Sequence, residues 1–339
     1  MIKTQPYCFS IILPVRNGGE FIKVCIDSIL SQTINEFDLI ILDSGSTDGT
    51  IEWLRSLKDP RIRLHLSDSP LSITENWKRI TGIPRNEWMT IIGHDDLLAA
   101  NYLETMGALI HKYPDASAYQ AHFTLVNEKG ITLRKCKPMT EVEKVKDLLD
   151  TMLANRINIF GTGLMMRSKD YDAVGGIPLY PNLLSADYVL WLELTAISYK
   201  ATSPVYCFSY RVGQSTTTTT STAVYIDALK YLVEYLMANR ENLSPGEDKE
   251  SYVKRVFSFY SLRATRRMLT VPAEKRSGIN VDAFVRETRV YAGSFLDNDS
   301  AFDPLSVPGV RLTKFIDSTW LTRTIYLFLK KVHPNPLMK

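Results

Sequence analysis

The chain has 339 residues, of which 45% are apolar and 23% charged, and its formal net charge is +3. These values are ordinary for a soluble globular protein with one large core and an appendage, or with two domains. The small net charge gives no support for nucleic-acid binding, and no run of 18 apolar residues predicts a membrane-spanning helix.

Four cysteines (Cys8, Cys25, Cys136 and Cys207) are scattered along the chain, two of them within apolar strand or helix patterns. This favours buried free thiols over disulfides or a cysteine metal site. The sequence enters an apolar strand pattern at once, without the pattern of a signal peptide, so we expect a reduced, cytoplasmic location.

The first elements form one strand–helix–strand unit. The apolar runs Phe9–Leu13 and Leu39–Leu42 predict buried strands, and Glu20–Gln32 between them has helical spacing. Each strand ends in a polar loop, Pro14–Asn17 and Asp43–Thr50 respectively. Because parallel strands end at the same sheet edge, where open α/β sheets bind ligands, we expect these loops to meet at a ligand site.

The strand and helix alternation continues to about residue 210. At Ser72, a serine followed three residues later by Glu75 predicts a helix start with a capping box. The section Ile131–Asn155 is charged and less regular, and we expect it to lie outside the sheet. We expect further helices over Gly49–Leu57, Ser72–Ile80, Asn101–His111 and Asp187–Ser198, and strands over Ile62–Leu66, Trp88–Ile92, Ser117–Val126, Ile157–Met166 and Pro204–Tyr210.

A hydroxyl-rich tract, Ser215–Thr222, separates this alternation from a purely helical remainder. The tract fits either an exposed linker or a mobile lid over the ligand site. After it, Val224–Asn239, Tyr252–Met268 and Thr313–Val332 have helical patterns. We therefore expect an α/β domain over residues 1–222 and a helical C-terminal domain over 223–339.

Three strand-end loops carry a family resemblance. PVRN at Pro14–Asn17, DSGSTDGT at Asp43–Thr50 and GHDD at Gly93–Asp96 together resemble the family 2 glycosyltransferases of the GT-A fold. The resemblance covers roughly the first 220 residues, and its motifs are specific only in combination. It implies a Rossmann-like, mostly parallel sheet flanked by helices, and inverting sugar transfer from a nucleotide-diphosphate sugar, with a UDP-sugar favoured.

The resemblance also implies a Mg²⁺ or Mn²⁺ cofactor at the third loop. Asp95 and Asp96 follow a predicted strand, and we expect them to hold the metal together with substrate phosphates. The family usually reads Asp-x-Asp-Asp here, so Gly93 replaces the first Asp and leaves its ribose contact unassigned. His94 between them is either an added ligand or a loop histidine that only forms hydrogen bonds.

Further residues are matched to donor binding. At the tip of the second strand, Asp43 can accept hydrogen bonds from a nucleobase or ribose, although the loop also fits a plain turn with a cap near Asp48. Arg211 suits a diphosphate because its planar fork binds two oxygens. The alternative for Lys78 is a surface helix position. The expected donor-binding set is Pro14, Val15, Arg16, Asp43, Asn76, Lys78, Asp95 and Arg211.

The expected catalytic base is Asp187, which opens an apolar helix as the family's base does. Asp is also a preferred helix N-cap, and Ala186 stands where the family often has Glu. On the acceptor side we expect Asn158, Gly161 and the stacking residue Tyr180. Glycine there would let a sugar approach the backbone closely.

Residues 311–339 hold six basic residues and one acidic residue, a net charge of +5. Leu321, Ile325, Phe328, Leu329 and Val332 share one helical face. Such a helix suits the interface of an anionic membrane, and the alternative is that the face packs on the protein's own core.

The predicted function is transfer of a sugar to a glycan or lipid-linked acceptor for a bacterial surface polysaccharide, with contact at the inner face of the plasma membrane as a further expectation. One rival is nucleotidyl transfer to a sugar phosphate, although Arg16–Gly19 makes a poor phosphate loop. Another rival is a non-catalytic nucleotide-sugar-binding or scaffold protein, which Gly93 and Ala186 favour and which Asp95, Asp187 and Arg211 disfavour.

Overall fold

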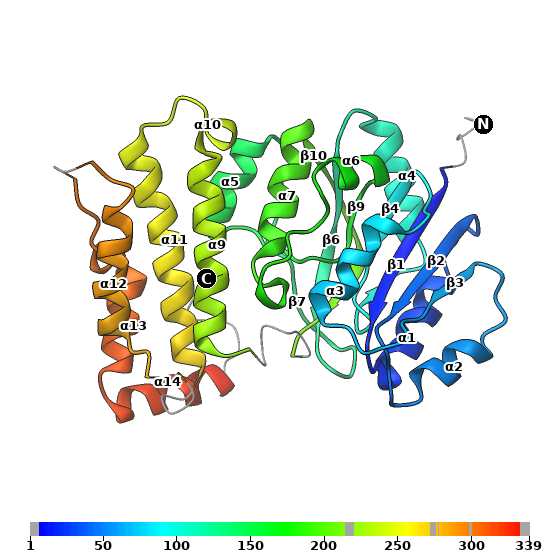
Figure 1. Cartoon of the computed structure of the whole chain (residues 1–339), viewed down its shortest axis with the longest axis horizontal. Helices are drawn as coiled ribbons and strands as arrows, with labels where there is room; N and C mark the ends of the chain where they lie inside the picture. Colours follow the sequence, from blue (N-terminus) through cyan, green and yellow to red (C-terminus); the bar gives the residue numbers. More distant parts are fainter. Residues whose placement is uncertain (1–6, 214–219, 272–275, 277, 298–299, 333–339) are drawn as a thin grey trace. The chain divides into compact units, whose positions relative to one another are not determined.

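The computed structural model describes residues 7–213, 220–271, 276, 278–297 and 300–332. The chain divides into two compact units, residues 1–218 and 219–339. Figure 1 shows an α/β unit followed along the chain by a helical one.

The first unit is built on one mixed ten-stranded sheet. Its order is β3-β2-β1-β4-β9-β6-β10-β5, with β7 paired to β6 and β8 paired to β10. Strands β1 to β4 are parallel, whereas β9 runs antiparallel to both β4 and β6. The strands are β1 (Phe9–Val15), β2 (Phe37–Asp43), β3 (Ile62–His65), β4 (Trp88–Ile91), β5 (Leu97–Leu98), β6 (Ala118–Val126), β7 (Thr132–Lys135), β8 (Val142–Glu143), β9 (Leu164–Arg167) and β10 (Lys200–Arg211).

Among the described residues of this unit, seven α-helices accompany the sheet. They are α1 (Gly19–Leu30), α2 (Thr50–Ser56), α3 (Ile73–Lys78), α4 (Tyr102–Lys112), α5 (Val145–Leu153), α6 (Ser168–Ala173) and α7 (Ala186–Ile197), with short 3₁₀ turns at Arg79–Gly82 and Pro181–Leu183. The α/β class is confirmed. The capping box that the sequence predicts is also present, since the Ser72 side chain accepts from the Glu75 amide and Glu75 accepts from the Ser72 amide.

Continuous apolar runs explain why β1 and β2 lie in the middle of the core. All seven residues of β1 are buried, as parallel strands covered on both faces require. Helix α1 buries Ile22, Cys25, Ile26 and Ile29 in the same core. The cysteines are free thiols, and Cys25, Cys136 and Cys207 are buried, as expected.

Two expectations for the middle of the chain are wrong in detail. The strand expected over Ile157–Met166 begins only at Leu164, because residues 157–163 form a loop that includes Gly161 and Gly163. The irregular section 131–155 contains β7, β8 and α5, and β7 and β8 extend the sheet at its margin.

The second unit is helical throughout its described residues. Its elements are α9 (Thr222–Ala238), α10 (Arg240–Leu243), α11 (Lys249–Thr270), α12 (Val281–Gly293), a 3₁₀ turn (Pro304–Ser306), α13 (Pro308–Asp317) and α14 (Trp320–Val332). Helix α11 packs against α9, α12 and α13. The helix expected over Thr313–Val332 is broken, and Figure 1 shows α14 turning away from the direction of α13.

Most of the tract Ser215–Thr222 lies outside the described residues, so its two interpretations stay open. Ser221 caps α9, its side chain accepting from the Val224 amide. In the described part of the chain, no helix combines the length and the apolar character needed to cross a membrane.

Candidate active site

The loops after β1 and β2 are joined by side-chain hydrogen bonds. Asp43 accepts from the Gly45 and Ser46 amides at 2.8 and 3.0 Å, and from the Ser46 hydroxyl at 2.5 Å. The same hydroxyl accepts from the Asn17 amide at 2.7 Å, and Asn17 accepts from the Thr47 amide at 2.9 Å. Asp43 has no exposed surface. It therefore shapes the loop, and the predicted contact with a base or ribose would require that loop to open.

Helix α3 supports the end of β2 from one side. Asn76 is buried and donates to the Leu42 carbonyl at 2.8 Å, while its own oxygen accepts from Arg79 at 2.9 Å. Arg79 also donates to the carbonyls of Asp43 and His65, both at 2.8 Å. Asn76 thus supports the end of β2 together with Arg79, and its predicted contact with the sugar donor stays a prediction.

The other residues expected to bind the sugar donor include two that are buried and two that are exposed. Pro14 and Val15 are buried at the end of β1, whereas Arg16 and Lys78 are exposed. Arg16 reaches the Leu71 carbonyl only at 3.4 Å, so its guanidinium retains capacity for a ligand. The donor contacts of these residues stay predictions.

Asp96, expected to be a metal ligand, is buried, and both of its carboxylate oxygens accept hydrogen bonds from the protein. It is 1% exposed; one carboxylate oxygen accepts from the Arg211 amide at 2.9 Å and the other from the Thr162 hydroxyl at 2.8 Å. Burial and the neighbouring Asp95 raise the pKa of Asp96 well above its usual range. In this structure Asp96 fixes the loop after β4, and its expected role as second metal ligand, which would require it to exchange these partners, stays a prediction.

Asp95 is placed differently. It is half-buried, and among the described residues no hydrogen bond or ion pair reaches its carboxylate. A Cβ atom at Gly93 would lie 2.9 Å from Asp95 Oδ1 and 3.0 Å from Asp96 Oδ2. The family's usual first Asp would therefore not fit here without movement of both carboxyl groups.

The Asp95 carboxylate fits a divalent cation whose other ligands are mainly substrate phosphates and water. No group of three or more His, Cys, Asp or Glu residues within the described ranges could hold a metal alone. Mg²⁺ is often bound by one or two carboxylates with waters and substrate phosphates, which is the arrangement that Asp95 permits. For His94, burial lowers the pKa of the imidazole, although Asp95 and Asp48 act in the opposite direction. Both interpretations of His94 stay open.

Arg211, expected to meet the diphosphate, points into the protein. It is 3% exposed, and its Nε donates to the Asp95 carbonyl at 2.7 Å. Its NH1 group donates to the carbonyls of Asn127 and Glu128 at 2.7 and 2.6 Å, and the guanidinium lies over the Phe21 ring. Because these partners are protein carbonyls, Arg211 holds the loop after β4, and diphosphate contact would require it to exchange them.

The expected base lies at a cavity. Asp187 is the second residue of α7, and the N-cap residue is Ser185, so the alternative that Asp187 only caps the helix is wrong. The start of a helix favours an ionised carboxylate. The cavity has a volume of about 160 Å³, and its lining is Ile73, Trp77, Gly161, Thr162, Ile177, Asn182, Leu183, Leu184, Ser185, Asp187 and Tyr210.

The segment before Asp187 is strained. Asn182, Leu183 and Ser185 have φ angles of 54°, 55° and 63°. These lie in the left-handed region that residues other than glycine rarely adopt. Such strain accumulates where a structure must hold ligand-binding groups in one geometry. This segment forms one side of the cavity.

The expected acceptor residues are only partly brought together. Gly161 lines the cavity, and a Cβ atom there would lie 3.5 Å from the Trp77 ring. Asn158 is turned toward another part of the chain, accepting from the Lys137 amide at 3.1 Å. Tyr180 is half-buried and does not line the cavity. The acceptor contacts of Asn158, Gly161 and Tyr180 therefore stay predictions.

Sequence reasoning missed three residues that the cavity brings together. Trp77 comes from α3, Thr162 from the loop before β9, and Tyr210 from β10. Tyr210 stacks on Phe160, their ring centroids 3.7 Å apart. Trp77 sits beside the predicted Asn76, and Thr162 beside Gly161, but no pattern in the sequence separates these side chains from ordinary core residues.

The mixed sheet and polar loops at its strand ends define a GT-A-like glycosyltransferase fold. Residues 10–174 match the model of glycosyl transferase family 2, so the chain carries a domain of this family. An uncharacterized glycosyltransferase of Rickettsia felis is 26% identical over 201 residues, which are 57% of this chain and 32% of that protein. The chain spans about a third of the length of the first curated relatives it matches.

Solved structures share the fold at low identity. S. aureus TarS 1–349, in complex with UDP-GlcNAc, has a TM-score of 0.59 and 13% identity, covering 91% of this chain and 90% of that one. The mannosyltransferase PcManGT from Pyrobaculum calidifontis, in complex with GDP-Man and Mn²⁺, has a TM-score of 0.51 and 15% identity, covering 97% and 88%. At these identities the likeness shows the fold alone.

Proposed function

We propose that this chain transfers a sugar from a nucleotide-diphosphate sugar, with a UDP-sugar favoured, to a glycan or lipid-linked acceptor, with inversion at the transferred carbon. The family 2 domain supports glycosyl transfer, and the two solved structures described above are of proteins bound to nucleotide sugars. An acceptor for a bacterial surface polysaccharide is part of the proposal, as is peripheral contact with a membrane through residues 311–339.

One observation carries the proposal. Asp187 and Thr162 line the same cavity, and the Thr162 hydroxyl donates to Asp96 in the loop after β4. The candidate base and the candidate metal loop are thus joined through one residue. A displacement reaction needs the base and the leaving group in a fixed relation, and a shared cavity together with the hydrogen bond from Thr162 to Asp96 supports such a relation.

The chain's residues would divide the work as follows. Asp187 accepts the proton of the acceptor hydroxyl as general base, and the start of α7 favours its negative charge. Trp77 and Tyr210 offer ring surfaces in the cavity, and Gly161 leaves room for a sugar beside them. The buried Arg211 holds the Asp95 backbone in place by donating a hydrogen bond to its carbonyl.

Asp95 would hold the divalent cation through its carboxylate. A bound Mg²⁺ or Mn²⁺ would neutralise charge that develops on the leaving diphosphate. Asp96 and Arg211 contribute by fixing the Asp95 loop, since a positioned ligand needs supporting hydrogen bonds.

The test is a screen of UDP-, GDP- and TDP-sugars for thermal stabilisation with and without Mn²⁺, followed by NMR of the product. The proposal expects stabilisation by one nucleotide class that requires the metal, and a product whose anomeric configuration is opposite to the donor's. Binding without transfer or hydrolysis would favour the non-catalytic alternative. A product of retained configuration would exclude the inverting mechanism.

A further inference from the structure

The end of α13 and residues 320–329 of α14 expose apolar side chains. Leu321, Ile325 and Phe328 are 59%, 50% and 64% exposed and lie on successive turns of one face of α14. Phe315 at the end of α13 is 65% exposed, and Trp320 at the start of α14 is 80% exposed. The sequence left open whether this face packs on the protein's own core. The exposed fractions show that these five side chains are not packed on that core.

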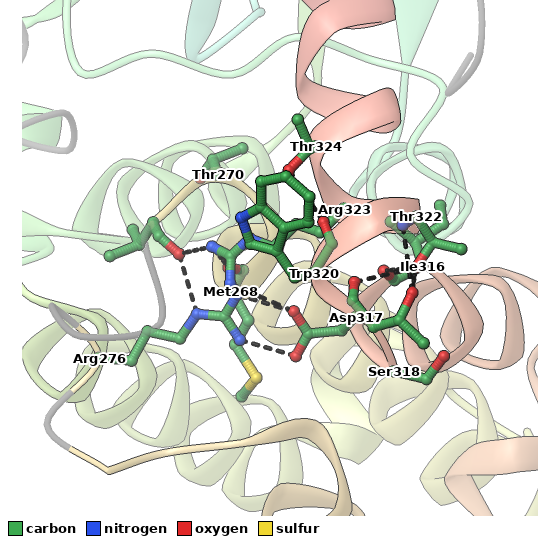
Figure 2. Close-up of polar contacts among 12 residues, drawn as sticks. Met268, Thr270, Arg276, Ile316, Asp317, Ser318, Trp320, Thr322, Arg323 and Thr324 are labelled. Atoms are coloured by element: carbon green, nitrogen blue, oxygen red, sulfur yellow. Dashed lines mark hydrogen bonds and ion pairs between the residues drawn. The ribbon is translucent and has the colours of Figure 1, made fainter.

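The single acidic residue of the segment is removed from that surface. Asp317 accepts from both terminal nitrogens of Arg276, each at 2.8 Å, and Arg323 lies 3.4 Å from the same carboxylate. Figure 2 shows this group, with the Asp317 carboxylate turned toward Arg276. The Asp317 side chain is 11% exposed, so its charge is balanced inside the unit and not presented to a partner.

The same group fixes the direction of α14. Arg276 donates from Nε to the Val271 carbonyl at 2.9 Å, and Arg323 donates to that carbonyl as well. Both arginines therefore bind the end of α11 and Asp317 together. The chain turns between Asp317 and Trp320, and Figure 2 shows Trp320 beside this turn. These contacts hold α14 in its orientation relative to α11 and α13, with its apolar face exposed.

We propose that this surface, defined as Phe315, Trp320, Leu321, Ile325 and Phe328, docks on an anionic lipid membrane. This deepens the peripheral contact included in the proposed function. An amphipathic helix with an apolar face and basic neighbours lies in the interface plane, where its apolar side chains enter the boundary of the acyl chains. Trp320 has the ring type that is enriched at headgroup level.

The positive charge of this segment favours lipids with anionic headgroups. Between residues 311 and 332 the sequence has five basic residues and one acidic residue, Asp317, which pairs with Arg276 and Arg323, while Lys314 pairs with Asp282. Lys330 and Lys331 follow the apolar residues in the last turn of α14. Juxtamembrane basic residues each add attraction to anionic headgroups, roughly fivefold in affinity per residue.

A second copy of this chain fits the surface less well. A twofold interface would place the same patch against itself and so set one positive segment against another. Like charges brought together in this way oppose association, whereas an anionic membrane is complementary to them.

The experiment is co-sedimentation of the full chain with phosphatidylcholine vesicles that contain 0, 15 or 30% phosphatidylglycerol. We expect binding that rises with the anionic fraction and falls as salt is raised from 50 to 500 mM. The triple variant Leu321→Glu, Ile325→Glu and Phe328→Glu should lose about 100-fold or more in partition, because it removes the inserted apolar side chains. Since these side chains are exposed, the helical circular dichroism and melting temperature should stay unchanged.

The matched control is Val290→Glu on α12, which changes an apolar residue that is 78% exposed in the same unit. It should alter partition less than twofold. The double variant Lys330→Gln and Lys331→Gln should weaken binding to anionic vesicles by roughly 25-fold and leave weak binding to neutral vesicles unaltered.

Two results would overturn the proposal. The triple variant could bind anionic vesicles as well as the wild type, or sedimentation velocity could show a wild-type dimer that the triple variant abolishes while vesicle binding is absent in both. The second result would assign the surface to a second copy. Neither measurement involves sugar transfer, so this proposal and the proposed function can fail separately.

Discussion

The backbone amide of Arg211 donates to the Asp96 carboxylate at 2.9 Å, across 115 positions of sequence. This bond joins the end of β10 to the loop after β4. Asp96 accepts a second bond from Thr162, which lines the cavity that contains Asp187. Three separate segments therefore meet at one buried carboxyl group, and a change in any of them is expected to reach the Asp95 loop.

Asp95→Ala should remove Mn²⁺-dependent binding of the nucleotide diphosphate and leave the fold intact. Its carboxylate has no partner among the described residues, so the folded state loses no hydrogen bond. Affinity measured by calorimetry in the presence of Mn²⁺ should fall about tenfold or more, to the value seen in EDTA. Asp68→Ala, which removes an exposed carboxylate in the same unit, is the control and should bind normally. Unchanged Mn²⁺-dependent affinity in Asp95→Ala would refute the assignment.

Arg211→Lys distinguishes a supporting residue from a diphosphate ligand. The ammonium group keeps the charge but cannot reach the carbonyls of Asp95, Asn127 and Glu128 together. We expect the free energy of unfolding to fall by about 2–4 kcal/mol, because buried carbonyls lose their partners. Denaturant titration measures this, with the exposed Arg55→Lys as control. If stability is kept and only nucleotide affinity is lost, the diphosphate role expected from the sequence is correct.

The first strands and their loops could be predicted because local signals agree there. Apolar runs end at Val15 and Asp43 in polar turn residues, and Ser72 with Glu75 forms the predicted capping box. The sequence therefore identified the sheet edge where the candidate site lies. It also placed Asp187 at the start of a helix, one position from where the structure has it.

Side-chain partners could not be predicted, because they come from distant segments. The family resemblance matched Arg211 to a diphosphate ligand, whereas the side-chain partners of Arg211 in the structure lie 83 to 116 positions away. The break between α13 and α14 has the same cause. Residues 317–319 contain neither Gly nor Pro, and the corner is held by the pairing of Asp317 with Arg276, 41 positions earlier.

Gly161 and Gly163 should respond differently to alanine. At Gly161 a Cβ atom meets Trp77 at 3.5 Å and Asp187 at 3.9 Å, which are ordinary contacts, so Gly161→Ala should fold normally and narrow the cavity. Gly163 has φ +77° and its Cβ would lie 2.7 Å from the Phe208 ring, so Gly163→Ala should destabilise the fold by roughly 1–3 kcal/mol.

Melting curves and steady-state kinetics separate the two alanine variants. Gly161→Ala should keep the melting temperature and raise KM, because the substrate enters a smaller cavity. Equal melting temperatures for the wild type and both variants would contradict the packing described for Gly163. An unchanged KM in Gly161→Ala would remove this glycine from the candidate site.

The decisive variant for the chemistry is Asp187→Asn. A general base acts only while the acceptor hydroxyl loses its proton, so it contributes to the transition state far more than to donor binding. Asparagine keeps the size of the side chain, and Asp187 is not the helix cap, so the fold should survive. We expect kcat to fall by about 10²- to 10⁴-fold, with donor affinity nearly unaltered. Glu193→Gln, six residues further along the same helix, is the matched control and should retain activity. Transfer at the wild-type rate by Asp187→Asn would show that this carboxylate serves only the start of α7, and the base would then have to be sought outside the residues assigned to this cavity.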